Sequence, residues 1–160
     1  MVSQHSVSLE KGCAERRVVA LAGDFTMANR NQIPQLWTTY FQAGAEIEAA
    51  VEGAMYGVSF GADERGNFRY GVGVEVSAEP LSLPDGFCLI SLSAGDYAVL
   101  RAFGPVTELP AMFDGLFERW IPENGFVPAP GAVFERYPSS DRNGPEAMEY
   151  EIWAPVTTRP

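Results

Sequence analysis

Positive charge is scarce in this sequence of 160 residues, which has 11 Lys and Arg against 21 Asp and Glu and a formal net charge of −10. Lys11 is the only lysine. Because contacts from Lys and Arg to phosphates supply much of the affinity of proteins for nucleic acids, we expect no direct nucleic-acid partner. The acidic balance favours a cationic partner, although an acidic surface also serves solubility.

Cysteine, histidine and long apolar runs are also scarce. Cys13 and Cys88 are too few for a disulfide framework, so we expect reduced thiols and a cytoplasmic protein. With His5 as the only histidine and no Cys-x-x-Cys motif, we expect no metal site and no cofactor. No apolar run approaches the roughly 20 residues of a membrane span, and residues 1–17 lack the apolar segment of a signal peptide. We therefore expect no membrane partner.

Two stretches near the C-terminus, residues 133–138 and 149–156, have the composition of β-strands. Alternate side chains of a strand point to opposite faces, so each stretch sets a carboxylate beside an aromatic ring. This mixture indicates a pocket in which acids are partly removed from water and need a cation. The alternative is an edge strand with a solvated glutamate beside an exposed ring. The two pairs are Glu135 with Tyr137, and Glu151 with Trp153.

The rest of the chain alternates between strand and helix patterns. Apolar residues spaced i, i+3, i+4, i+7 predict one helix from Ile33 to Phe41 and a second from Leu109 to Trp120. Asn31 and Thr107 are the expected N-caps. Further strands are expected at 17–23, 56–61, 68–76, 87–92 and 97–103, a hairpin turn at 63–67, and loops at 79–86 and 127–132.

The two halves of the chain align with an offset of 76 residues, which places Asn31 on Thr107, Val58 on Phe134 and Glu75 on Glu151. We therefore predict an α+β fold: a pseudo-two-fold repeat of two strand-helix-strand-strand units that form an antiparallel sheet with two helices around a ligand cleft. After an N-terminal tail or first strand at 1–16, a single domain is expected over 17–157, with halves at about 17–79 and 87–157.

The offset also predicts how side chains divide between the two faces of the sheet. The small residues of the first half would leave space that the acids and rings of the second half line, because a glycine in a strand often marks a close approach. The core face would hold Val58, Phe60, Val74, Val76, Phe134, Tyr150 and Ile152. The ligand face would hold Gly57, Ser59, Gly73, Glu75, Glu135, Tyr137, Glu151 and Trp153.

The order and spacing of several motifs resemble the GyrI-like domain, also known as the effector-binding domain of AraC-type and MerR-type multidrug regulators. The resemblance covers about residues 17–157. It rests on Leu36-Trp37, Gly57-Val58-Ser59-Phe60, Tyr70-Gly71-Val72-Gly73-Val74, Ala94-Gly95-Asp96-Tyr97-Ala98, Gly104, Trp120-Ile121-Pro122, Phe134-Glu135-Arg136-Tyr137 and Glu151-Ile152-Trp153-Ala154-Pro155-Val156.

This resemblance implies a cleft between two pseudo-symmetric halves that binds bulky hydrophobic, often cationic compounds. By the same resemblance, Glu135 is the acid that meets a cationic ligand and Glu151 is a second acid. Tyr137 and Trp153 would be aromatic walls. Further residues implied at variable positions of the family are Tyr56, Trp37 and Trp120.

The leading functional prediction is a stand-alone small-molecule-binding protein of multidrug type, since no DNA-binding helices precede the domain to support direct transcription regulation. A second class is a hydrolase of hydrophobic genotoxins, in which Glu135 acts as a general base although no catalytic triad or metal set accompanies it. A third class is a gyrase-inhibitor-like module that binds an unknown protein, but the acids form no clear run.

Overall fold

The computed structural model describes residues 4–160, so residues 1–3 of the expected N-terminal segment lie outside the described residues. The N-terminal segment was expected to be a tail or a first strand, and residues 4–13 form a strand. The elements in order are β1 (Gln4–Cys13), β2 (Arg16–Thr26), the 3₁₀ turn η1 (Arg30–Gln32), α1 (Ile33–Ala43), β3 (Ala54–Phe60), β4 (Asn67–Val76), β5 (Phe87–Leu92), β6 (Gly95–Gly104), the 3₁₀ turn η2 (Val106–Glu108), α2 (Leu109–Gly115), the π-helical turn η3 (Leu116–Trp120), α3 (Ile121–Glu123), β7 (Phe126–Pro128), β8 (Val133–Pro138) and β9 (Met148–Thr158).

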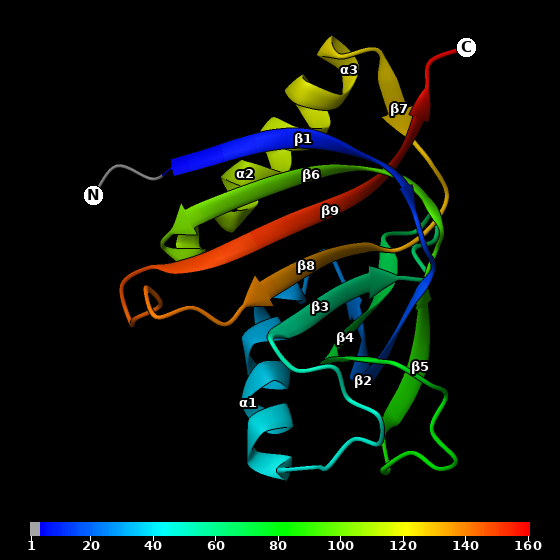
Figure 1. Cartoon of the computed structure of the whole chain (residues 1–160), viewed down its shortest axis with the longest axis vertical. Helices are drawn as coiled ribbons and strands as arrows, with labels where there is room; N and C mark the ends of the chain where they lie inside the picture. The colour runs from blue at the N-terminus through cyan, green and yellow to red at the C-terminus, as the bar shows by residue number, and fades with distance from the viewer. Residues whose placement is uncertain (1–3) are drawn as a thin grey trace.

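The strands form one antiparallel sheet in the order β1-β6-β9-β8-β3-β4-β2-β5, and β7 pairs with the end of β9. The two edge strands each pair with the other half of the chain, because β1 pairs with β6 and β5 pairs with β2. In Figure 1 the helices lie at opposite ends of the molecule, with α2 behind β1 and β6 and α1 beside β3 and β4. The expected α+β class, with an antiparallel sheet and two main helices, is confirmed.

The strand order is symmetric about the central pair β3–β8, which is flanked by β4 and β9, then β2 and β6, then β5 and β1. Val58 lies directly opposite Phe134, and these are the two residues that the 76-residue offset makes equivalent. Gly57 pairs with Glu135 and Ser59 with Val133 on either side of them. A two-fold axis through the first pair would exchange the other two pairs.

Both helices begin differently from the prediction. Asn31 and Thr107 lie inside the 3₁₀ turns that precede α1 and α2, and neither N-cap residue makes a side-chain capping bond. Proline in the first turn of each helix fits the expected start, because its missing N–H has no helical partner there. No helix within residues 4–160 is both long and apolar enough to cross a membrane.

The region after the second helix also departs from the prediction. The expected continuous helix from 109 to 120 is divided into α2 and the π-helical turn η3, and α3 extends the helical segment to Glu123. Phe126–Pro128, partly assigned to a loop, forms β7 against the last residues of β9. Because β6 pairs with β9 only as far as Pro155, the end of β9 is available for this short strand.

The predicted division of side chains between the two faces is wrong, because the predicted core residues of β4 and β9 lie on the face opposite to Val58 of β3 and Phe134 of β8. Residues directly opposite one another share a face, and Glu135 lies opposite both Gly57 and Ile152. Phe134 lies opposite Val58 and Trp153. The face that carries Glu135 is covered by the helices, since Ile152 belongs to an apolar cluster with Leu116 of η3 and Ile121 of α3. We call it the helix face and the other side the opposite face.

The glycines of the first half approach protein atoms rather than an empty space. A Cβ built on Gly57 would collide with the Tyr70 hydroxyl and would lie 2.9 Å from a Glu135 carboxylate oxygen. A Cβ built on Gly73 would collide with the main chain of β2 at Val19. The close approach predicted from the glycines is therefore present, but the partner at Gly57 is the hydrogen-bonded pair of Tyr70 and Glu135.

Candidate functional site

Glu135 is the centre of the candidate site. It is 4% exposed and is the only charged residue buried in the described part of the chain. Its Oε1 accepts a hydrogen bond from the Tyr70 hydroxyl at 2.7 Å and a second from the Tyr137 hydroxyl at 3.0 Å. None of the ion pairs formed by residues 4–160 includes Glu135. The carboxyl group is thus held by two phenols without a neutralising cation.

Trp37 of α1 covers the two phenols. Its Nε1–H donates to the Tyr70 hydroxyl oxygen at 3.3 Å. Its ring meets the Tyr137 ring edge to face, with the centroids 5.3 Å apart. The amphipathic pattern of α1 turns Trp37 toward the sheet, and the strand alternation of β4 and β8 turns Tyr70 and Tyr137 toward the same point. A chain of donors therefore runs from the indole through Tyr70 to Glu135.

Burial controls the charge state of this group. Removal from water raises the pKa of Glu135 to about 7, and the hydrogen bonds from Tyr70 and Tyr137 oppose that rise. Burial together with the neighbouring Glu135 raises the pKa of both tyrosines well above the ordinary phenol value. The phenols therefore remain donors, while Glu135 can change its protonation state near neutral pH.

Tyr150 adds an unmatched polar atom on the same face. Its side chain is fully buried, and its hydroxyl has no hydrogen-bond partner among residues 4–160. Burial raises the pKa of Tyr150 to about 12, and the charge of Glu108 adds to the effect. Tyr137 packs against the buried apolar cluster that contains Tyr150, so the two rings lie in one neighbourhood. The helix face thus offers one acid surrounded by aromatic rings.

Glu151, Trp153 and Tyr56 do not join this group, and the prediction that Glu151 and Trp153 share a face with Glu135 is wrong. The Trp153 Nε1–H donates to Glu151 at 2.9 Å, and Arg136 lies 3.4 Å from the same carboxylate. The Tyr56 hydroxyl donates to Glu75 at 2.9 Å. These residues lie on the opposite face because β8 and β9 pair Arg136, not Glu135, with Glu151. A shift of one residue in register moves a whole strand's side chains to the other face.

Trp120 also lies elsewhere. It belongs to η3, and its ring stacks on Phe126 with the centroids 6.1 Å apart. Of the seven predicted site residues, Glu135, Tyr137 and Trp37 come together. Tyr70, which the sequence offered only as part of a family motif, was not among the predicted site residues. A buried phenol usually needs a hydrogen-bond partner, and this need was the available signal.

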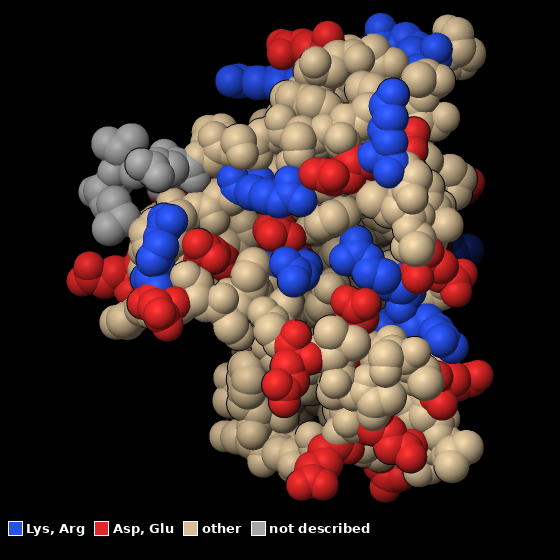
Figure 2. Space-filling view, in the orientation of Figure 1, with Lys and Arg blue, Asp and Glu red and all other residues tan. Residues whose placement is uncertain are grey.

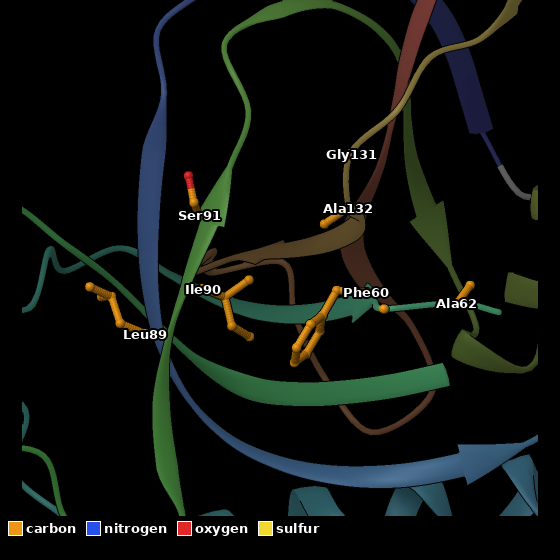
Figure 3. A pocket seen from close by; sticks show the side chains of 8 residues that line it. Phe60, Ala62, Leu89, Ile90, Ser91, Gly131 and Ala132 are labelled. Atoms are coloured by element: carbon orange, nitrogen blue, oxygen red, sulfur yellow. The ribbon is translucent and has the colours of Figure 1, made fainter. Parts of the chain in front are cut away.

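Two surface hollows lie away from Glu135. The larger, about 520 Å³, lies between the end of β3, the strand β5 and the segment before β8 (Figure 3). The smaller, about 350 Å³, is lined by Phe25, Phe68 and Arg69 among others. Within residues 4–160, no group of three or more His, Cys, Asp or Glu side chains could hold a metal ion.

Comparison with known proteins agrees with this fold. The GyrI-like small molecule binding domain matches residues 11–157, and the chain therefore belongs to this family. The structure of SAV2435 bound to tetraphenylphosphonium has a TM-score of 0.76 at 18% identity, over 95% of this chain and 94% of that chain. The EcmrR C-terminal domain has a TM-score of 0.64 at 15% identity, over 99% of both chains.

One relative is also similar in sequence. The transcriptional regulator BrlR of Pseudomonas aeruginosa is 29% identical over 114 residues, which is 71% of this chain and 42% of BrlR. The chain thus spans less than half the length of that regulator. The family resemblance predicted from the motifs is confirmed.

Proposed function

We propose that this domain binds a bulky hydrophobic organic cation at Glu135, with Tyr70, Tyr137 and Trp37 around it. The observation that carries the proposal is the buried Glu135 carboxyl, held by two phenols and with no ion pair among the described residues. A buried charge without a cationic partner is costly, so a ligand that supplies the positive charge would gain the full benefit of neutralising it.

The surrounding rings favour an organic cation over a metal ion. A cation near an aromatic face gains about 0.5–2 kcal/mol per ring, more when water is excluded. Trp37 and Tyr137 present such rings at the site, whereas residues 4–160 contain no cluster of three or more His, Cys, Asp or Glu side chains that could hold a metal ion. Burial of the ligand's apolar surface would supply the remaining affinity at about 25 cal/mol per Å².

Access to Glu135 requires movement of α1. Trp37 covers the phenols, yet α1 has no fully buried residue and its Phe41 is 62% exposed. Besides Trp37, α1 packs on the sheet through Tyr40, whose ring centroid lies 6.0 Å from that of Phe87. Displacement of the Trp37 side chain would expose Tyr70, Tyr137 and the carboxyl together.

The comparisons support the ligand class. SAV2435 has the same fold, and its structure has been determined with tetraphenylphosphonium, a hydrophobic cation, bound. BrlR is a transcriptional regulator, but direct contact with DNA is not part of this proposal. Basic side chains are few, and the face in Figure 2 shows them interspersed with acids rather than gathered in a patch.

We further infer that the two halves are structural repeats and that the site lies beside their common axis. The symmetric strand order and the central pair Val58–Phe134 support this inference. Glu135 is the neighbour of that pair, and its equivalent in the first half is Ser59. The repeat therefore supplies two similar frames, of which one carries the acid.

Hydrolysis is a second candidate that the same group supports. A carboxyl group with a pKa near 7 is suited to act as a general base, and two phenols lie within hydrogen-bond reach of it. If the site is hydrolytic, mass spectrometry of an incubated electrophilic, cyclopropane-bearing ligand will show a product one water heavier. That product would disappear with Glu135→Gln. Recovery of unchanged ligand from the wild-type protein would exclude this second candidate.

Isothermal titration with tetraphenylphosphonium tests the leading proposal. The neutral control is triphenylphosphine oxide, which keeps three phenyl rings without the net charge. We expect the cation to bind at least tenfold more tightly at pH 8, where Glu135 is ionised. Equal affinities for the two compounds, or no binding of the cation, would contradict a charge-selective site.

A further inference from the structure

The outer edge of β5 is free of pairing. Within residues 4–160, β5 pairs only with β2. The Ala22 N–H donates to the Gly86 carbonyl at 3.5 Å, which continues the β2–β5 register by one pair. Because successive residues of a strand direct their main-chain groups to opposite edges, Leu89 and Ser91 turn their N–H and C=O groups away from β2.

The larger hollow adjoins this edge. Its volume is about 520 Å³, and no charged side chain lines it. Figure 3 shows Ile90 pointing across the hollow toward Phe60, with Ala132 beside them and Leu89 turned away. The two residues with outward main-chain groups, Leu89 and Ser91, also line the hollow.

The two edges of the sheet are protected to different degrees. The edge strand β1 carries Glu10 and Lys11 and has a register shift between Glu10 and Cys13. Charges and bulges of this kind discourage a further strand from pairing. In contrast, Phe87–Leu92 contains no charged residue and no proline, and it pairs with β2 in one continuous register. An unprotected edge beside an apolar hollow is the arrangement that strand addition requires.

We propose that this edge binds an extended segment of another protein, which adds a strand to β5 and places an apolar side chain in the hollow. Main-chain bonds to Leu89 and Ser91 would provide affinity, and the hollow formed by Phe60, Ile90 and Ala132 would select the side chain. The site is separate from Glu135 and does not depend on the proposed ligand.

The surrounding charges define the partner further. Asp85 lies just before β5, the Arg69 guanidinium lies over the Phe60 ring at the hollow, and the chain as a whole has a net charge of −10. A partner segment with an apolar centre and Lys or Arg at its ends, beyond the hollow, would complement the acidic balance of the chain. A second copy would bring the same negative net charge.

Fluorescence anisotropy with a labelled peptide, Lys-Thr-Val-Thr-Phe-Thr-Val-Lys, tests the proposal. Ser91→Pro removes one outward N–H and leaves the β2 pairing intact, so binding should weaken at least tenfold. Ser91→Thr keeps that N–H, and Glu135→Gln alters the separate site, so both should bind within twofold of the wild type. Ala62→Trp, an exposed change at the hollow, should also weaken binding at least tenfold and does not depend on the tolerance of proline in β5.

Three outcomes would overturn the proposal. The first is failure of the wild-type protein to bind the peptide at about 200 μM, a concentration between the millimolar and micromolar ends of the affinity scale. The second is undiminished binding by both Ser91→Pro and Ala62→Trp. The third is a dimer in sedimentation that Ser91→Pro converts to a monomer, because a second copy would then occupy the edge.

Discussion

The Tyr70 hydroxyl donates a hydrogen bond of 2.7 Å to Glu135 Oε1 across 65 residues of sequence. This hydroxyl occupies the position that a Cβ at Gly57 would need. Gly57 lies directly opposite Glu135 in the β3–β8 pair, so three strands meet at one hydrogen bond. The contact depends on sheet register and on the small size of one residue, and each dependence can be tested.

Gly57→Ala should destabilise the protein by about 1–3 kcal/mol, since the added methyl group must displace Tyr70 or Glu135 from a packed site. Urea unfolding measures the change. The control is Gly115→Ala in α2, where a Cβ meets no atom within 4 Å, and we expect a gain of up to about 1 kcal/mol. A Gly57→Ala protein as stable as the wild type would show that the contact is not tightly packed.

Tyr70→Phe should raise the pKa of Glu135 above its wild-type value of about 7. In the wild type the Tyr70 hydrogen bond stabilises the ionised carboxylate, and the variant loses that stabilisation. It also leaves the Trp37 Nε1–H without its acceptor. We expect a loss of roughly 1–3 kcal/mol in unfolding free energy. Carbon-detected NMR titration of the Glu135 carboxyl measures the pKa, and an unchanged value would contradict the bond.

Tyr150→Phe is the matched comparison for that loss. The Tyr150 hydroxyl is buried without a partner, so its removal should leave stability unchanged or increase it by about 1 kcal/mol. The readout is the urea midpoint of the ligand-free protein. A loss as large as that of Tyr70→Phe would mean that the hydroxyl has a partner in solution.

The pH dependence of stability follows from the raised pKa of Glu135. The folded protein holds this proton up to about pH 7, whereas an unfolded glutamate releases it near 4.5. The contribution of this group to stability is therefore complete below pH 4.5 and is lost as pH rises to about 7, by roughly 3 kcal/mol.

The unfolding free energy of Glu135→Gln minus that of the wild type, measured between pH 4 and 8, isolates this effect. The difference should rise with pH up to about 7 and then remain constant, so the variant is as stable as the wild type or more so at pH 8. A difference that falls with pH would indicate a stabilised carboxylate, which is the opposite electrostatic state.

The sequence revealed the elements better than their pairing. The alternation around Glu135 predicted β8 with its observed bounds, and the apolar stripe that contains Trp37 predicted α1. The 76-residue offset made Val58 and Phe134 equivalent but did not predict that they pair, because an alignment of repeats does not state which strands are neighbours. The sequences of the edge strands β1 and β5 do not show that each pairs with a strand from the other half of the chain.

The candidate site was predicted in part for the same reason. Glu135, Tyr137 and Trp37 come from elements whose inward faces could be inferred from periodicity. Glu151 and Trp153 were placed beside them on the assumption that β8 and β9 share one phase, whereas Glu135 pairs with Ile152. Phase between neighbouring strands is decided by turn geometry and burial over the whole sheet, which a single strand pattern does not contain.

The most direct test of the central claim is calorimetry of tetraphenylphosphonium and neutral triphenylphosphine oxide with wild-type protein, Glu135→Gln and Glu151→Gln. Glu151 is the matched control, an acid on the neighbouring strand that is paired with Arg136 on the opposite face. We predict that Glu135→Gln weakens the cation by about 1.5–3 kcal/mol and the neutral compound by much less. Glu151→Gln should leave both affinities within about twofold, or about 0.4 kcal/mol. Equal losses of both compounds with Glu135→Gln, or a larger loss of the cation with Glu151→Gln, would contradict the assignment of Glu135 as the cation-binding acid.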